Sequence, residues 1–371
     1  MNIENLIHLF QNTHNELKSR AARSVDTHLV VRNWLFGWYI VEFENGGAER
    51  AELYGKELIK KLSEKLTANI GRGFSKRSLE QFRQFYLSYR EITQALPAQS
   101  PNALQKITQA LPAKLDKLPE TMPNIIKCLS LRFVVGWTHY VTLMTIKDEQ
   151  ERRFYEIEAV ENGWGYRELE RQINSSLYER LVLSRDKEKV KELSEKGQVI
   201  EKPQDVIKNP FVLEFLNLPE HPHYSENQLE TAIIDKLQQF LLELGKGFLF
   251  EARQKRFTFD NDHFFVDLVF YNRLLKSYVL IDLKRDKLAH QDLGQMQMYV
   301  NYFDRFVKLD DENPTIGIVL CHRKNDAVVE LTLPENSNIY ASQYQLYLPS
   351  KEELKKQIED AEKEFTERKH E

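Results

Sequence analysis

Two apolar runs joined by a short polar turn, within residues 262–299, constrain the fold of this chain more than any other feature. Residues 264–271 and 278–284 are rich in aromatic and β-branched side chains, which favour β-strands. The second run is apolar enough to be buried on both faces of a sheet, yet it ends in Asp282 and Lys284. The pattern predicts two strands with charged side chains at the end of a buried one.

Three charged side chains are expected to converge at that strand end. Asp282 and Lys284 are two residues apart, so they leave the strand on the same side. If the two strands pair as a hairpin, Asp267 of the first strand joins them. Two buried carboxylates are costly unless a cation compensates them, and oxygen ligands with open water positions suit Mg²⁺ or Mn²⁺. The alternative is a structural Asp–Lys pair, since these residue types are common.

A metal ion at this point would give the three side chains catalytic roles. Asp267 and Asp282 are the candidate metal ligands, with the Leu283 carbonyl completing the shell. Such an ion activates a water molecule and stabilises the charge that develops on a phosphate. Lys284 is then placed to orient that water or to offset the additional negative charge.

Helical patterns flank the predicted strands. Upstream, Ser225 and Gln228 form a capping box that opens a helix, and Glu230 lies one turn into it. Downstream, apolar residues recur at helical spacing, and Gln295 and Tyr299 share one face because they are four residues apart. With one strand before the pair and another after the second helix, the predicted order is helix, three strands, helix, strand.

This order and these residues resemble the PD-(D/E)xK nuclease superfamily, which has the restriction-endonuclease-like fold. Asp267, followed by Asp282-Leu283-Lys284, stands where that pattern has its metal ligands and its lysine. Glu230 resembles the additional helical acid of the branch that includes junction resolvases. Gln295-xxx-Tyr299 resembles the QxxxY helix motif of the RecB-type branch. Asp282 departs from the commoner Glu at its position, although the pattern allows either.

Longer phrases resemble the YhcG-type family of bacterial proteins, and the likeness covers nearly the whole chain. They are LLELGKGF at 241–248, DLVFY at 267–271 and GQMQMY at 294–299. The resemblance implies an all-α N-terminal domain followed by an α/β C-terminal domain with a restriction-endonuclease-like αβββαβ core. It also implies a DNA endonuclease that requires Mg²⁺ or Mn²⁺, with Glu230 as a further metal ligand. Gln295 would steady the lysine or a DNA phosphate, with Tyr299 beside it.

One part of the helical N-terminal half has helix-turn-helix character. Gly71 and Gly73 make a tight turn, and Ser75 caps the helix that follows. The polar side chains of this helix include Arg and Gln, which reach base edges in DNA. A solvated helix face is the alternative interpretation. The candidate DNA-binding residues are Arg72, Lys76, Arg77, Gln81, Arg83 and Gln84.

Four segments are expected along the chain. Residues 1–183 form a helical, DNA-binding domain, and residues 184–219 form a charged linker and docking segment. Residues 220–349 form the nuclease domain, and residues 350–371 form an amphipathic helix. The narrow apolar stripe of that last helix would either pair with another subunit, which allows a homo-oligomer, or pack on its own domain.

Composition limits the classes of partner and compartment. The net charge is −4, so any contact with DNA must come from local basic patches. The two cysteines, Cys128 and Cys321, are far apart, which argues against a zinc site or disulfide framework and fits a reducing cytoplasm. No apolar run approaches the roughly 20 residues of a membrane span, and no signal peptide is visible.

Other functions stay open beside the endonuclease. A DNA-binding or assembly protein could keep the nuclease fold and cleave little. An RNA nuclease is a further alternative, because no residue in the sequence distinguishes ribose from deoxyribose. The family resemblance suggests partners in restriction or defence, or a role in DNA repair, which is association rather than chemistry.

Overall fold

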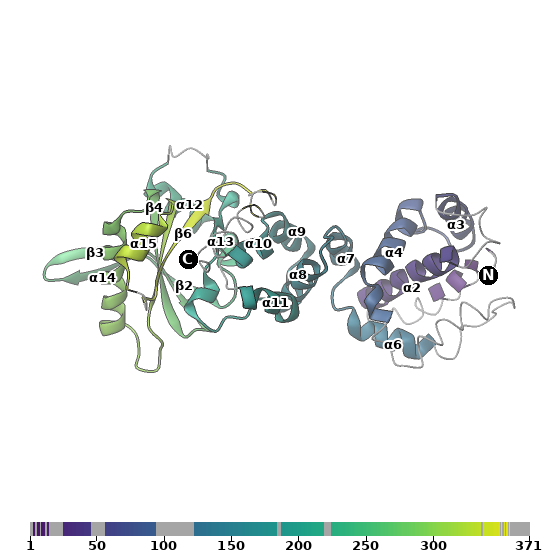
Figure 1. Ribbon diagram of the computed structural model, residues 1–371, viewed down its shortest axis with the longest axis horizontal. Helices are drawn as coiled ribbons and strands as arrows, with labels where there is room; N and C mark the ends of the chain where they lie inside the picture. Colours follow the sequence, from purple (N-terminus) through teal and green to yellow (C-terminus); the bar gives the residue numbers. More distant parts are fainter. Residues whose placement is uncertain are drawn as a thin grey trace, which may run out of the picture. The chain divides into compact units, whose positions relative to one another are not determined.

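The computed structural model describes most of the chain, which divides into two compact units (Figure 1). Unit 1 consists of Met1–Arg152 and Ala159–Leu169, and unit 2 of Arg153–Glu158 and Glu170–Glu371. The expected helix at 350–371 lies outside the described residues, except for single positions up to residue 356. The described segments are 25–45, 56–93, 122–183, 187–218, 224–334 and 337–348, with isolated residues between 3 and 14.

Unit 1 is helical, as the sequence predicts. Its described helices are α2 (Val25–Asn45), α3 (Lys56–Asn69), α4 (Lys76–Ser88), the short η2 (Arg90–Thr93), α6 (Met122–Arg132), α7 (Trp137–Leu143), α8 (Glu149–Glu161) and α9 (Tyr166–Asn174). Helices α8 and α9 also have residues in unit 2.

Helix α2 forms the centre of unit 1 because it is apolar around most of its circumference. Trp34 and Phe36 are fully buried and contact aromatic rings of α4, with Trp34 lying edge-on to Tyr86 at 5.1 Å. Gly37 lets the two helices approach closely, since a Cβ there would lie 1.9 Å from the carbonyl oxygen of Phe82. The aromatic residues of α2 are therefore core, not a surface for stacking bases.

Unit 2 is built on a six-stranded mixed sheet with the order β1-β6-β5-β4-β3-β2. β2 pairs antiparallel with β3 and β3 antiparallel with β4, whereas β4, β5, β6 and β1 pair in parallel. The strands are β1 (Phe211–Val212), β2 (Phe248–Phe259), β3 (Asp262–Asn272), β4 (Ser277–Lys287), β5 (Ile316–Arg323) and β6 (Ile339–Gln345).

Helices cover both faces of this sheet. Period-two alternation along β3 sends Leu268 into one apolar cluster with α12 and α13, and Val269 into another with α14. The order α12, β2, β3, β4, α14, β5, β6 confirms the predicted αβββαβ order. The helices are α10 (Leu177–Leu183), α11 (Lys187–Lys196), η3 (Pro203–Val206), η4 (Glu214–Leu216), α12 (Glu226–Asp235), α13 (Leu237–Leu244), α14 (His290–Phe306) and α15 (Asp326–Thr332).

Residues 184–219 are predicted to be a charged linker and docking segment, and the described residues 187–218 are part of unit 2. Phe211 of β1 pairs with Tyr344 of β6, and it is fully buried in the core cluster beneath α12 and α13. Asp205 is buried as well, since its carboxylate accepts the backbone N–H groups of Glu201 and Lys202. This charge-dense segment therefore packs on unit 2 through a few buried apolar side chains and a buried carboxylate that is satisfied by backbone N–H groups.

Among the helices that the structure describes, none is both long and apolar enough to cross a bilayer.

A buried ion-pair network joins α10, α13 and β1 in unit 2. Nη1 of the fully buried Arg180 lies 2.5 Å from Oε1 of Glu243, which also accepts the N–H of Val212 at 2.9 Å. Lys208 donates to the carbonyl of Glu243. Burial acts to raise the pKa of Glu243, but Arg180, Lys208 and Arg171 together lower it to about 2. The network therefore depends on a charged carboxylate in the core.

We expect Glu243→Gln to destabilise the protein at pH 7 by about 3–5 kcal/mol, because it leaves Arg180 as an uncompensated buried charge. The pKa of Glu243 is lowered from 4.5, so its stabilising contribution is present above that pH and is lost as the pH falls towards 2. Denaturant unfolding should therefore show a smaller difference between the two proteins at pH 3 than at pH 7. Glu192→Gln, in an exposed pair with Lys196, is the control and should change little. A difference that does not vary with pH would contradict this role of the carboxylate.

Candidate active site

Strands β3 and β4 stop pairing at one point, which we call the fork. Their ladder runs from Asn272↔Ser277 to Leu268↔Ile281. Beyond it β3 continues only with β2, and β4 continues with β5. Asp267 and Asp282 are the next residues of the two strands, so the fork is lined by two of the three predicted metal ligands.

The carboxylate of Asp267 takes the place of the missing ladder bond at the fork. Its Oδ2 accepts the backbone N–H of Leu283 at 2.8 Å, and its Oδ1 accepts Nε2 of Gln254 at 2.9 Å. Burial raises the pKa of Asp267, against the lowering effects of the Leu283 N–H and the Lys284 ammonium. The carboxylate is therefore fixed in direction, with its charge only partly compensated.

Asp282 is 2% exposed and lies beside Lys284, as predicted. Its Oδ2 is 2.9 Å from Nζ of Lys284, which is ion-pair distance, and this buried oxygen accepts no other hydrogen bond from a described residue. Burial, and then the negative charge of Asp267, raise the pKa of Asp282 to about 7. Burial acts to lower the pKa of Lys284, but Asp282 raises it above its ordinary value. One ammonium thus faces two carboxylates.

Glu230 of α12 is buried but is not a third member of this group. Both Arg253 and Gln254 of β2 donate to its carboxylate. Among the described residues, no three His, Cys, Asp or Glu side chains are arranged to hold a metal ion. The structure therefore brings Asp267 and Asp282 together and connects Glu230 to them through Gln254.

Gln254 is the functional candidate that the sequence did not indicate. It lies opposite Asp267 in the β2–β3 register, between the pairs Arg253↔Leu268 and Lys255↔Val266. Its φ is +46°, an uncommon conformation for a non-glycine residue, and such strain clusters at functional sites. Glutamines are common, so only the register and the backbone conformation, not the sequence pattern, identify this one.

The predicted pair on α14 lies beside the fork. Gln295 donates to the hydroxyl of Tyr299, which is almost fully buried. Burial raises the pKa of Tyr299, and the charges of Asp282 and Asp267 add to this effect. The phenol is therefore a neutral group close to the two carboxylates.

The predicted DNA-binding residues lie on and before α4 in unit 1. Ser75 caps α4 by accepting the N–H of Ser78 at 3.2 Å, after a turn in which Gly71 and Gly73 have φ values of +111° and +109°. Arg83 is an exception to the predicted face, because its Nε forms an ion pair with Glu44 of α2 at 2.8 Å. Gln81 is half-buried, and the exposed residues are Arg72, Lys76, Arg77 and Gln84.

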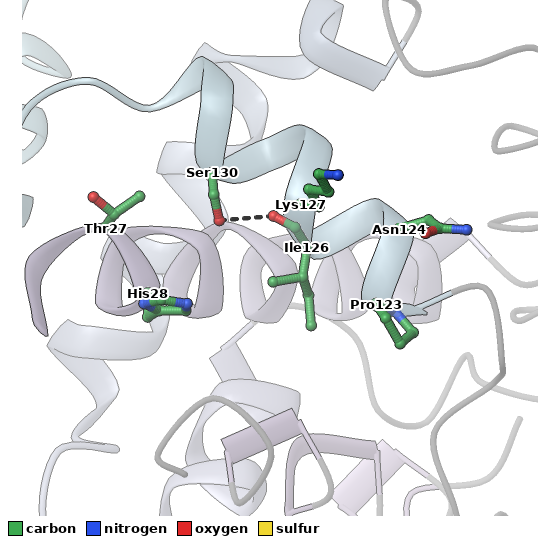
Figure 2. A pocket seen from close by; sticks show the side chains of 7 residues that line it. All are labelled: Thr27, His28, Pro123, Asn124, Ile126, Lys127 and Ser130. Carbon is green, nitrogen blue, oxygen red and sulfur yellow. Dashed lines mark hydrogen bonds between the residues drawn. The ribbon is translucent and has the colours of Figure 1, made fainter. Parts of the chain in front are cut away.

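A pocket of about 540 Å³ lies elsewhere, between α2 and α6 of unit 1 (Figure 2). Within it the hydroxyl of Ser130 donates to the carbonyl of Ile126 at 2.8 Å. Its lining contains no carboxylate, so it lacks the acidic pair that the fork provides. The lining residues are Thr27, His28, Pro123, Asn124, Ile126, Lys127 and Ser130.

The fork has donors that fit a divalent cation. Asp267 and Asp282 supply two hard oxygen ligands, and the free acceptor capacity of Asp282 Oδ2 is left in a buried position. Mg²⁺ in phosphate-processing sites is commonly held by one or two carboxylates, waters and substrate phosphates. Two carboxylates are therefore sufficient, and Glu230 would have to leave Arg253 and Gln254 to join them.

Both halves of the chain match known domains. Residues 204–359 match the YhcG PDDEXK nuclease domain, and residues 10–180 match the DUF1016 N-terminal domain. An Escherichia coli (strain K12) protein named "Putative nuclease YhcG" is 38% identical over 365 residues, which are 95% of this chain and 91% of that protein.

A solved structure of a repair endonuclease from Pyrococcus abyssi is similar over 34% of this chain and 49% of its own, with 18% identity and a TM-score of 0.23. Extensive identity to the Escherichia coli protein, together with the two domain matches, establishes the family. The chain belongs to the YhcG family, and its C-terminal unit has the restriction-endonuclease-like fold of a PDDEXK nuclease domain.

Proposed function

We propose that this protein is a metal-dependent DNA endonuclease that hydrolyses phosphodiester bonds at the fork. One observation carries the proposal: Asp267 and Asp282 meet where β3 and β4 part, with the Lys284 ammonium 2.9 Å from Asp282. A PDDEXK nuclease domain supports it independently. The family resemblance associates such an activity with restriction, defence or DNA repair.

Each side chain at the fork has a role in this proposal. Asp267, aimed by the Leu283 N–H, and Asp282 would hold Mg²⁺ or Mn²⁺, which supplies Lewis acidity and lowers the pKa of a bound water. Lys284 stays protonated beside Asp282, so it can orient the attacking water or offset charge on the phosphate. Gln295 donates to the hydroxyl of Tyr299, and in this proposal it would steady Lys284 or the phosphate.

The direct test is cleavage of plasmid and branched DNA with Mg²⁺ or Mn²⁺. Asp267→Asn and Lys284→Ala are each expected to reduce the rate by at least about 100-fold, because each removes charge placed at the reacting phosphate. Asp286→Asn and Lys287→Ala, exposed residues at the end of the same strand, are the matched controls and should retain activity. Comparing cleavage of DNA with cleavage of an RNA of the same sequence shows whether the protein acts on deoxyribose or ribose backbones.

Two outcomes would contradict the proposal. Cleavage that survives Asp267→Asn would mean that the reaction takes place elsewhere. DNA binding in gels without cleavage under any metal would favour the alternative of a DNA-binding protein that keeps the nuclease fold. The engagement of Glu230 by Arg253 and Gln254, which leaves the acids in two groups, is the observation that favours this alternative.

Gln254 acts in this proposal as a positioning residue. Its amide joins Asp267 to Glu230, so it sets the direction of one oxygen of each carboxylate. Its backbone adopts a positive φ at the position opposite Asp267, and such strain is typical of functional sites.

We expect Gln254→Ala and Gln254→Gly to weaken the stabilisation of the protein by Mn²⁺ by about 10-fold in apparent affinity, because both remove the amide. Thermal unfolding across a Mn²⁺ titration measures this without any substrate. Gln254→Gly should be the more stable variant by about 1 kcal/mol, since glycine adopts positive φ without strain. Gln297→Ala on α14 is the control. An unchanged response to Mn²⁺ in both variants would exclude the positioning role.

The exposed face of α4 is proposed to hold duplex DNA. Arg77→Ala combined with Gln81→Ala is expected to weaken binding of a cleavage-silenced Asp267→Asn protein by about 5-fold to 10-fold, through lost phosphate and base-edge contacts. Gel shifts at fixed salt measure the change, and Lys61→Ala on α3 is the control. Stabilisation of the double variant by Mn²⁺ should be unchanged. Loss of both DNA binding and stabilisation by Mn²⁺ would contradict separate roles for the two units.

A further inference from the structure

The hairpin of β2 and β3 continues past the fork as a two-stranded arm, residues Lys255–Val266. Its ladder runs from Lys255↔Val266 to Phe259↔Asp262, without pairing to β4. Figure 1 shows this hairpin projecting from unit 2 at the left. Five residue pairs correspond to a length of about 17 Å.

One face of the arm is anchored to α14. Phe257 stacks on Phe264 and on Tyr302, with ring centroids 5.4 Å and 4.1 Å apart, and meets Tyr299 edge-on at 5.5 Å. Tyr299 is also the partner of Gln295, so the arm and the fork share a support. The position of the arm is therefore fixed relative to the candidate active site.

The opposite face of the arm is exposed and carries cationic, polar and aromatic side chains. Arg256 lies opposite Phe265, and Thr258 lies opposite His263. Nη2 of Arg256 is 2.9 Å from Nε2 of His263, whose Nδ1 is 3.0 Å from the Thr258 hydroxyl. Alternation along the arm puts these side chains on the face opposite Phe257 and Phe264, which pack with α14. In the β2–β3 register this exposed face begins two residue pairs beyond Gln254 and Asp267.

Arg256 differs from the neighbouring cations of β2 in its partners. Arg253 pairs with Glu230, and Lys255 pairs with Glu251 at 3.2 Å. Arg256 has no carboxylate partner within the part of the chain that the structure describes, and its positive charge is held in place by His263. Phe265 beside it is 44% exposed, which places an aromatic surface next to an uncompensated cation.

We propose that this face of the arm binds duplex DNA beside the cleaved phosphate. Arg256 and His263 suit the phosphate backbone, and Phe265 suits the apolar surface of a sugar or base. A two-stranded β-ribbon also has the width that a DNA major groove admits. A single phenylalanine among polar groups is too small an apolar patch to fit a protein partner better. The inference rests on the proposed nuclease function and adds where the substrate is held.

The test measures binding of a short DNA duplex to an Asp267→Asn protein, in which cleavage is silenced. Adding Arg256→Ala and Phe265→Ala is expected to weaken binding by about 10-fold at fixed salt, and to reduce the salt dependence by about one phosphate contact. Arg256→Glu should weaken it further, because it repels the backbone. Adding Lys255→Ala, the ion-paired neighbour, should leave binding within about 2-fold.

The outcomes distinguish this inference from the nuclease proposal. If the Asp267→Asn protein binds DNA and the unmodified protein cleaves it, equal affinity of the arm variants overturns the arm inference alone. If the unmodified protein neither binds nor cleaves DNA, both are overturned. Thermal unfolding of the arm variants should match that of the parent, because Arg256 and Phe265 are exposed. Weaker binding in a variant with unchanged unfolding supports the arm as a DNA-binding surface.

Discussion

The hydrogen bond from the Leu283 N–H to the Asp267 carboxylate is the interaction on which the candidate site depends. A regular antiparallel ladder would have given that N–H a backbone carbonyl. Here a side chain accepts it, so the two strands part without leaving a buried donor unsatisfied. The same bond fixes an acid at the point of separation. The same hydrogen bond therefore both ends the β3–β4 ladder and positions one member of the acidic pair.

The charges at the fork do not cancel, because two carboxylates face one ammonium group. Lys284 offsets part of the charge, while burial and the charge of Asp267 still raise the pKa of Asp282, and burial raises that of Asp267. Elsewhere in unit 2 the buried Glu243 is surrounded by several cations and has a low pKa. The contrast separates the two kinds of buried acid: Glu243 holds elements together, and Asp282 retains unused acceptor capacity.

Much of unit 2 could be predicted because its signals are local. Runs of aromatic and β-branched side chains located β3 and β4, and the spacing of Asp282 and Lys284 put both on one side. Gln254 could not be predicted, since its role comes from cross-strand register and a positive φ that no sequence pattern encodes. The two-residue β1 was hidden in a segment dense in charge, where only its partner strand makes it recognisable. Arg83 was misleading because its partner Glu44 is 39 residues away.

The two ends of the six-stranded order have a consequence for self-association. Unpaired strand edges invite pairing with other chains. At one end the sheet closes with β1, which is only two residues long. At the other end β2 is long, but its register shifts between Phe250 and Ala252, and cationic side chains follow the shift. A sheet limited in this way offers no long, flat border on which fibrils could begin.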